Sequence, residues 1–224
     1  SYVNKYGSDV FRLHLMFAFA YTDGGPWSDE GIKSINRFIA RVENIVSKLD
    51  EEKSKNSKNV VEAPEDELIY KCNETIKGVT ADAEKFQFNT VVAKLMELLN
   101  QIYEYDSTVQ NKNMNVYEET VKTFIKLLAP FAPHFCEEMW ERLHEMPSIF
   151  KAKWPEYKNI TKKEIEIVIQ LNGKVKHKMM VQNGLSKEEL EKLVLNDNKI
   201  IALIDSREIK KVICVPNKLV NIVV

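Results

Sequence analysis

Basic side chains gather at three places in the sequence, in patterns that suit contact with a polyanion. Lys33, Arg37 and Arg41 are spaced by four residues, so in a helix they would lie along one face, and Lys48 extends the line. Such a line can follow a phosphate backbone, although charged helix faces are commonly only solvated. Two further groups lie near the end of the chain: Lys174, Lys176 and Lys178, and then Lys210, Lys211 and Lys218. We predict that these three groups, without Lys48, bind phosphates.

The charge balance differs between the two parts of the chain. Residues 161–224 carry 12 Lys/Arg and 8 Asp/Glu, a net charge of +4, within a chain whose formal net charge is −1. The C-terminal quarter is therefore the better candidate for an anionic partner. Ordinary scatter of surface charge would explain the same numbers equally well.

Residues that could perform catalysis do not converge in the sequence. His14 and His134 lie in apolar helical segments and are expected to be core histidines, while His144 is expected near a helix C-terminus. No Gly-rich phosphate loop and no Ser/His/Asp or Cys/His signature is present. We expect a binding chain with no catalytic residues and no cofactor of its own.

The three cysteines, Cys72, Cys136 and Cys214, lie far apart. This scatter favours reduced, buried thiols in a cytoplasmic protein and gives no zinc-binding pattern, so we expect no metal site. No apolar run approaches the roughly 20 residues that a membrane span needs, and no signal peptide opens the chain, so no membrane partner is expected. The sequence begins at Ser1 without an initiator Met, which suggests a part of a longer chain.

Residues 1–157 have the periodicity of a helical bundle. The clearest helix is predicted over 28–49, with Ser28 as its N-cap and apolar residues at steps of three and four. Further helices are predicted over 8–20, 64–83, 86–105, from about 115 to Ala129, and from Pro133 to about 145. Long amphipathic helices joined by polar loops indicate an all-α bundle.

Residues 162–224 change to an alternating pattern, which predicts a second, small domain with the order ββααββ. A hairpin is predicted over 164–181 around Asn172-Gly173. Ser186 and Glu189 form a capping box before one short helix, and Asn198 is expected to cap the next. Two β-branched runs, 208–215 and 219–224, complete the α+β chain.

Two registers are possible for the predicted hairpin. A two-residue loop would place lysines on the same face as the isoleucines of the first strand. A three-residue loop, 171–173, would pair Gln170 with Lys174 and separate the polar from the apolar face. We predict the second register, which places Lys174, Lys176 and Lys178 together on the polar face.

Several motifs of the helical part resemble the class Ia aminoacyl-tRNA synthetases. The segment from Tyr6 to Leu13, YGSDVFRL, is similar to the Y-G-A-D-x-x-R-L segment of that class. The segments 36–38, 88–90 and 128–140 resemble its helical anticodon-binding domain. These motifs alone do not separate leucyl from valyl or isoleucyl enzymes.

Two C-terminal motifs resemble the bacterial leucyl-tRNA synthetases specifically. QLNGKVK at 170–176 is similar to their hairpin V-Q-V-N-G-K-V-R, and the ending at 212–224 is similar to V-P-G-K-L-V-N-I-V. Lys176 replaces the usual Arg, Asn217 replaces Gly, and Glu43 stands where many members have Trp.

The resemblance implies a function in tRNA recognition. The longer parent would join leucine to tRNA(Leu) with ATP and Mg²⁺, in the cytoplasm and as a monomer, with catalytic and editing domains that this chain lacks. The bundle would contact the stem on the anticodon-arm side, and the small domain would contact the tRNA elbow. A helical protein-interaction module without an RNA role, or the equivalent part of a valyl or isoleucyl enzyme, remains the alternative.

Overall fold

The computed structural model describes residues 2–20, 22–55, 66–162, 164–205 and 207–224. The chain forms two compact units, residues 1–160 and 161–224. The first is helical, and the second contains the sheet, so the expected α+β class is confirmed. None of the helices in the described ranges combines the length and apolarity required to cross a membrane.

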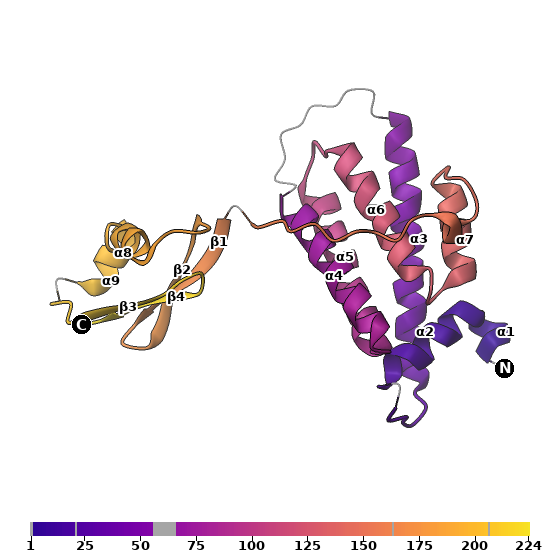
Figure 1. Ribbon diagram of the computed structural model, residues 1–224, viewed down its shortest axis with the longest axis horizontal. Helices are drawn as coiled ribbons and strands as arrows, with labels where there is room; N and C mark the ends of the chain where they lie inside the picture. The colour runs from indigo at the N-terminus through magenta and orange to yellow at the C-terminus, as the bar shows by residue number, and fades with distance from the viewer. Residues whose placement is uncertain (1, 21, 56–65, 163, 206) are drawn as a thin grey trace. The chain divides into compact units, whose positions relative to one another are not determined.

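The helical unit is a bundle (Figure 1). In order, its helices are α1 (Tyr2–Tyr6), α2 (Ser8–Ala18), α3 (Asp29–Lys55), α4 (Asp66–Glu84), α5 (Phe88–Thr108), α6 (Met114–Leu128), α7 (Pro133–Arg142) and the 3₁₀ turn η1 (Ile149–Lys151). The long helix α3 lies between α6 and α7 in the view of Figure 1. Short α1 was not predicted, and α3 continues six residues beyond its predicted end at 49. The predicted helix start at Pro64 lies outside the described residues.

Local sequence signals explain how several helices begin and end. Ser28 Oγ accepts a hydrogen bond from Gly31 N at 3.1 Å, which is the N-cap expected for α3. Asn113 caps α6 in the same way through Val116 N. Most of the apolar stripe of α3 is buried in one core, where Ile32, Ile35 and Leu49 have no exposed surface.

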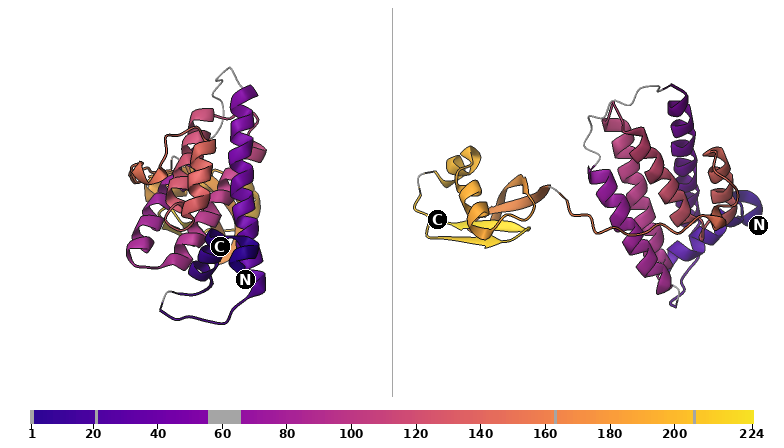
Figure 2. Two further views of the ribbon diagram at one scale, coloured as in Figure 1. Left: turned by 90° about the vertical axis from the view of Figure 1, so that its right-hand side faces the viewer. Right: turned by 45° about the horizontal axis from the view of Figure 1, so that its top comes forward.

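The small unit has one layer of helices on one face of a four-stranded sheet (Figures 1 and 2). Its elements are β1 (Glu164–Leu171), β2 (Lys174–Gln182), α8 (Lys187–Leu195), α9 (Asn198–Ile204), β3 (Lys211–Val215) and β4 (Leu219–Val223). The strand order is β2-β1-β4-β3, with β1 and β4 parallel and the other pairs antiparallel. A second core unites the inner residues of the sheet with both helices: Ile167, Ile169, Leu171, Val220 and Ile222 with Leu190, Val194, Ile200 and Ile204.

The capping predictions for the small unit have different outcomes. The capping box of Ser186 and Glu189 is present at the start of α8, with both reciprocal hydrogen bonds formed. The predicted cap at Asn198 is wrong by one residue. Asp197 caps α9 instead, since its carboxylate accepts from the amides of Lys199 and Ile200.

The predicted hairpin register is wrong. Leu171 pairs with Lys174, so the loop contains only Asn172 and Gly173, both with positive φ (50° and 77°). That is the geometry of a two-residue primed turn. A bulge then shifts the pairing, so that Ile169 lies opposite His177 while Gln170 lies opposite Val175. Lys176 is the extra residue of this bulge.

Candidate nucleic-acid interface

The first two cations of the predicted stripe on α3 differ in their partners. Both Lys33 and Arg37 are exposed. Lys33 Nζ lies 2.6 Å from Glu30 Oε1, and this hydrogen bond raises the pKa of Lys33 and lowers the pKa of Glu30. Arg37 Nη2 donates to Ser34 Oγ at 2.8 Å, a neutral partner. Arg37 can therefore turn toward a phosphate without leaving a carboxylate unpaired.

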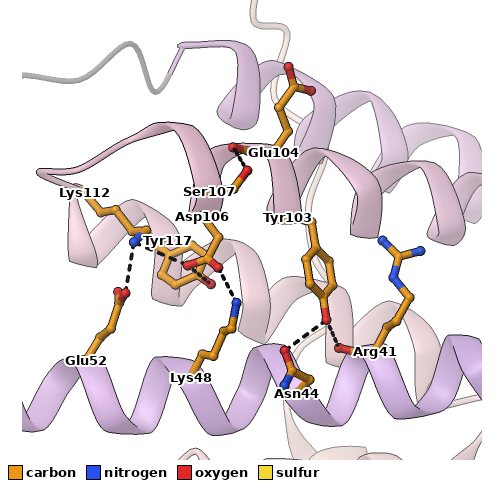
Figure 3. A network of polar contacts seen from close by, with 10 residues as sticks. All are labelled: Arg41, Asn44, Lys48, Glu52, Tyr103, Glu104, Asp106, Ser107, Lys112 and Tyr117. Atoms are coloured by element: carbon orange, nitrogen blue, oxygen red, sulfur yellow. Dashed lines mark hydrogen bonds and ion pairs between the residues drawn. The ribbon is translucent and has the colours of Figure 1, made fainter.

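Arg41 lies over an aromatic ring. Its guanidinium carbon lies 4.6 Å from the ring centroid of Tyr103, and its Nη2 donates to Asn100 Oδ1 at 2.9 Å. The Tyr103 hydroxyl donates back to the carbonyl oxygen of Arg41 at 2.9 Å and also contacts Asn44 (Figure 3). A stacked guanidinium has few accessible rotamers, so this cation is preorganised.

Lys48 has a different role from the other cations on α3. It donates to Asp106 at 2.9 Å, inside a network that also contains Lys112, Glu52 and the Tyr117 hydroxyl (Figure 3). Burial acts to raise the pKa of Asp106, but hydrogen bonds and charge from Lys48 and Lys112 lower it overall. Removing Lys48 would leave a nearly buried carboxylate short of a partner, so this residue braces α3 against α5.

The lysines of the hairpin do not share one face, in contrast to the prediction. Lys174 lies opposite the buried Leu171, at the edge of the core-facing row. Lys176 occupies the bulge, and Lys178 lies opposite Val168 on the face that the helices leave uncovered. All three side chains are exposed, and Lys178 Nζ contacts Glu166 Oε1 at 2.7 Å.

Four of the six C-terminal lysines lie toward one end of the sheet. The pairing rows run Lys174–Leu171–Ile222–Val212 across the four strands. Lys211 pairs with Val223, and Lys210 N donates to Val223 O at 2.8 Å, just beyond that row. Strands lie about 4.8 Å apart, so Lys174 on one edge and Lys211 on the other are roughly 14 Å apart across the sheet. Lys176 lies on the same edge strand as Lys174, two residues farther from the turn.

Lys218 lies nearer the other end of the same strands. Val168 N donates to the carbonyl oxygen of Lys218 at 3.0 Å, and Val168 also pairs with Lys178. The six predicted lysines therefore form two groups on the small unit. Lys174, Lys176, Lys210 and Lys211 form the first group, which we call the tip group, and the second group is Lys178 and Lys218.

The histidines are not arranged for shared chemistry. His14 is buried, as expected, and burial lowers its pKa. The expected burial of His134 is wrong, because its side chain is 76% exposed and its Nδ1 lies 3.1 Å from Asp9 Oδ1.

Within the described ranges, no group of three or more His, Cys, Asp or Glu side chains could hold a metal ion. The three thiols are all buried, and burial raises the pKa of Cys72 to about 12.

Comparison with protein families identifies the helical architecture. A family model described as the anticodon-binding domain of tRNA ligase matches residues 65–192. The chain belongs to this family. The match begins just before α4 and ends within α8, so it includes the first hairpin of the small unit.

Leucine–tRNA ligases are among the curated relatives, and they match along the whole chain. The enzyme of Caldanaerobacter subterraneus subsp. tengcongensis is 52% identical over 100% of this chain and 28% of its own length. The enzyme of Clostridium kluyveri is 48% identical over 99% of this chain and 28% of its own length. The chain thus spans about 28% of the length of these curated relatives, and it corresponds to their C-terminal region.

Solved structures give the same relationship. The chain matches a leucyl-tRNA synthetase from Agrobacterium radiobacter K84, solved as a ternary complex with tRNA and LeuAMS, with a TM-score of 0.80 and 27% identity. That match covers 99% of this chain and 29% of the solved chain. Free methionyl-tRNA synthetase from Mycobacterium tuberculosis matches 65% of this chain with a TM-score of 0.53 and 16% identity, a likeness of fold alone.

Proposed function

We propose that this chain binds tRNA(Leu) as the C-terminal part of a leucyl-tRNA synthetase. The observation that carries the proposal is the similarity to leucine–tRNA ligases through both units, at up to 52% identity. The parent enzyme would join leucine to tRNA(Leu) with ATP and Mg²⁺ in the cytoplasm. Its catalytic and editing domains would be partners of this chain within one monomer, and the chain itself would hold neither cofactor.

The composition of the small unit suits contacts with RNA phosphates and not stacking on RNA bases. Residues 161–224 contain no Phe, Tyr or Trp, so aromatic stacking on bases is not available to them. Their net charge of +4 and their exposed lysines suit phosphates instead. Recognition by phosphate position and RNA shape fits the tRNA elbow, which we propose as the contact of this unit.

The helical unit offers a second contact through α3. Among the described side chains of α3, Arg37 and Arg41 are the cations that are not paired with a carboxylate, and Arg41 is already held in place by Tyr103. Lys33 lies on the same helix but is paired with Glu30. We propose that this face contacts the phosphates of the stem on the anticodon-arm side.

A filter-binding titration against tRNA(Leu) over a series of salt concentrations tests the function. We expect log K to fall linearly with log salt, because each phosphate contact releases counterions. Replacing Lys174 and Lys176 with Ala should weaken binding. It should also make the slope of log K against log salt less steep, by the contribution of up to about two phosphate contacts. Lys178→Ala should have less effect, since Lys178 is already paired with Glu166.

Two controls separate the alternatives. A tRNA(Val) transcript and a tRNA(Ile) transcript should bind less tightly than tRNA(Leu) if the chain belongs to a leucyl enzyme. Binding that is absent, or insensitive to salt, with intact folding would reject RNA recognition and favour a helical protein-interaction module.

A further inference from the structure

An extended segment, residues 153–160, crosses the helical unit between η1 and the small unit (Figure 1). We call it the strap. Three residues of α4, each one turn from the next, contact three residues of the strap in antiparallel order. Asn73 binds Lys158, Lys77 lies over the ring of Tyr157 at 5.0 Å, and Thr80 accepts from Trp154.

Asn73 provides the most specific of these contacts. Its Oδ1 accepts from Lys158 N at 2.8 Å, and its Nδ2 donates to the carbonyl oxygen of the same residue. The carboxamide thus pairs with one strap residue as a neighbouring β-strand would. Asn73 is only 4% exposed, so losing either bond would leave a buried polar group unpaired.

The rest of the strap is not packed tightly against the bundle. An open groove of about 570 Å³ lies between the strap, α4 and α6, lined by Cys72, Ile76, Val116, Trp154 and Pro155 among others. Because apolar contact there is incomplete, the hydrogen bonds of Asn73 and Thr80 determine where the strap lies. Trp154 Nε1 donates to Thr80 Oγ1 at 2.9 Å as the second fixed point.

The bond to Asn73 also sets the length of chain that joins the two units. Only residues 159–163 separate Lys158 from the start of β1 at Glu164, a reach of at most about 22 Å. We call the residues between the last strap residue hydrogen-bonded to the helical unit and Glu164 the tether. Without Asn73 the tether would start after Trp154, with only the exposed contact of Lys77 and Tyr157 remaining along it, and without Thr80 as well it would start after Ala152. The tether would then grow from five residues to nine or eleven.

We propose that Asn73 is a positioning residue for RNA binding. By holding Lys158 on α4 it keeps the tether short, so RNA held by the helical unit meets the lysines of the small unit at a higher effective concentration. The proposal rests on the proposed RNA-binding function, but the restraint on the tether exists without RNA.

Distance measurements on the RNA-free chain test the restraint directly. Spin labels at Ser107→Cys and Lys192→Cys, both exposed sites on different units, report the distribution of distances between the units. We expect Asn73→Leu to broaden it and Asn73→Leu/Thr80→Val to broaden it further. Asn73→Asp, which keeps an acceptor for Lys158 N but loses the donor, should fall between wild type and Asn73→Leu.

The matched control is Thr75→Val on the same helix. Thr75 is also buried (3% exposed), and its hydroxyl donates to Lys71 O within α4, so its loss removes a buried polar group without touching the strap. The control should leave the distance distribution unchanged. A distribution that Asn73→Leu does not broaden, in a chain folded as judged by circular dichroism, would overturn the proposal.

The consequence for RNA is tested by a double-mutant comparison. Effective concentration falls with about the 3/2 power of tether length, so Asn73→Leu should weaken tRNA binding about twofold and the double variant about threefold. In a background with the tip group, Lys174, Lys176, Lys210 and Lys211, replaced by Ala, both should have little effect. An equal loss in both backgrounds would assign Asn73 a local structural role only.

The two proposals can fail separately. If the wild-type chain does not bind tRNA, the proposed function fails, while the distance measurement still decides whether Asn73 restrains the tether.

Discussion

Asp9 connects α2 to the start of α7 through one carboxylate. Its Oδ2 accepts from Phe135 N at 2.7 Å, its Oδ1 lies 3.1 Å from His134 Nδ1, and Arg12 lies 3.4 Å away. An acidic group at a helix N-terminus satisfies a first-turn amide and interacts favourably with the helix dipole. The motif that begins at Tyr6 contains this Asp. Its contacts with α7 give the Asp a structural role.

Removing this carboxylate should destabilise the helical unit. We expect Asp9→Ala to lower the free energy of unfolding by about 1–3 kcal/mol, because a buried amide loses its acceptor. Urea unfolding followed by tryptophan fluorescence measures it, since Trp27, Trp140 and Trp154 all lie in this unit. The exposed His134→Ala should stay within about 0.5 kcal/mol of wild type. A similar loss in both variants would show that His134 is the residue that matters.

His134 is the one histidine that was misjudged, and the cause is physical. His14 and His134 both follow apolar residues, and helical periodicity does not distinguish them. His134 is the second residue of α7, where the chain enters the helix and the side chain can still point to solvent. Lys48, which was not among the predicted phosphate-binding residues, matches the cation stripe by spacing, but the fold pairs it with Asp106.

At the scale of elements, the hairpin shows what a pattern can and cannot predict. The strands and their turn were predicted, and residues 165, 167 and 169 do face the core. The register was wrong because we assumed an uninterrupted ladder. The bulge at Lys176 allows a two-residue turn and still returns His177 and Met179 to the isoleucine face. Bulges arise from sheet twist and packing, which alternation alone does not encode.

The turn geometry gives a prediction for two positions with positive φ. Gly173→Ala should destabilise the small unit by about 1 kcal/mol, because an L side chain is strained at φ 77°. Asn217→Gly, at φ 59°, should be neutral or slightly stabilising. Because the small unit has no Trp, thermal unfolding must be followed by amide or methyl NMR. A neutral Gly173→Ala would contradict the left-handed turn.

Burial of His14 between α2 and α3 predicts a pH dependence of stability. The ring packs edge-on against Trp27 at 4.6 Å, and burial lowers its pKa from the ordinary value of 6.5. The unfolded chain then binds a proton more readily than the folded chain, so this residue reduces stability as pH falls through about 6.5 and below. Unfolding at pH 7.5 and pH 5.5 should show a smaller drop for His14→Leu than for wild type. Equal drops would mean that His14 is protonated inside the fold.

For the whole molecule, the sequence pattern predicted a second unit. It did not predict how the strap that connects the two units is bound to α4. The change from helical to alternating periodicity near residue 160 predicted a division, and the structure divides at 160/161. No contact between residues 153–160 and the bundle was predicted. Its contacts join Asn73 to Lys158 across 85 residues, and no local pattern relates positions so far apart.

Limited digestion with proteinase K should report how this connection is held. The strap is fixed through Trp154 and Lys158, so among the described segments the first cut in the connection should fall within 159–162. Mass spectrometry should then find fragments close to residues 1–160 and 161–224. In Asn73→Leu/Thr80→Val the susceptible region should extend back toward residue 153, because proteolysis needs a segment that leaves its hydrogen bonds. Thr75→Val should cut as wild type does. Early cuts within 153–158 of the wild-type chain would show that the bonds to α4 do not hold the strap in solution.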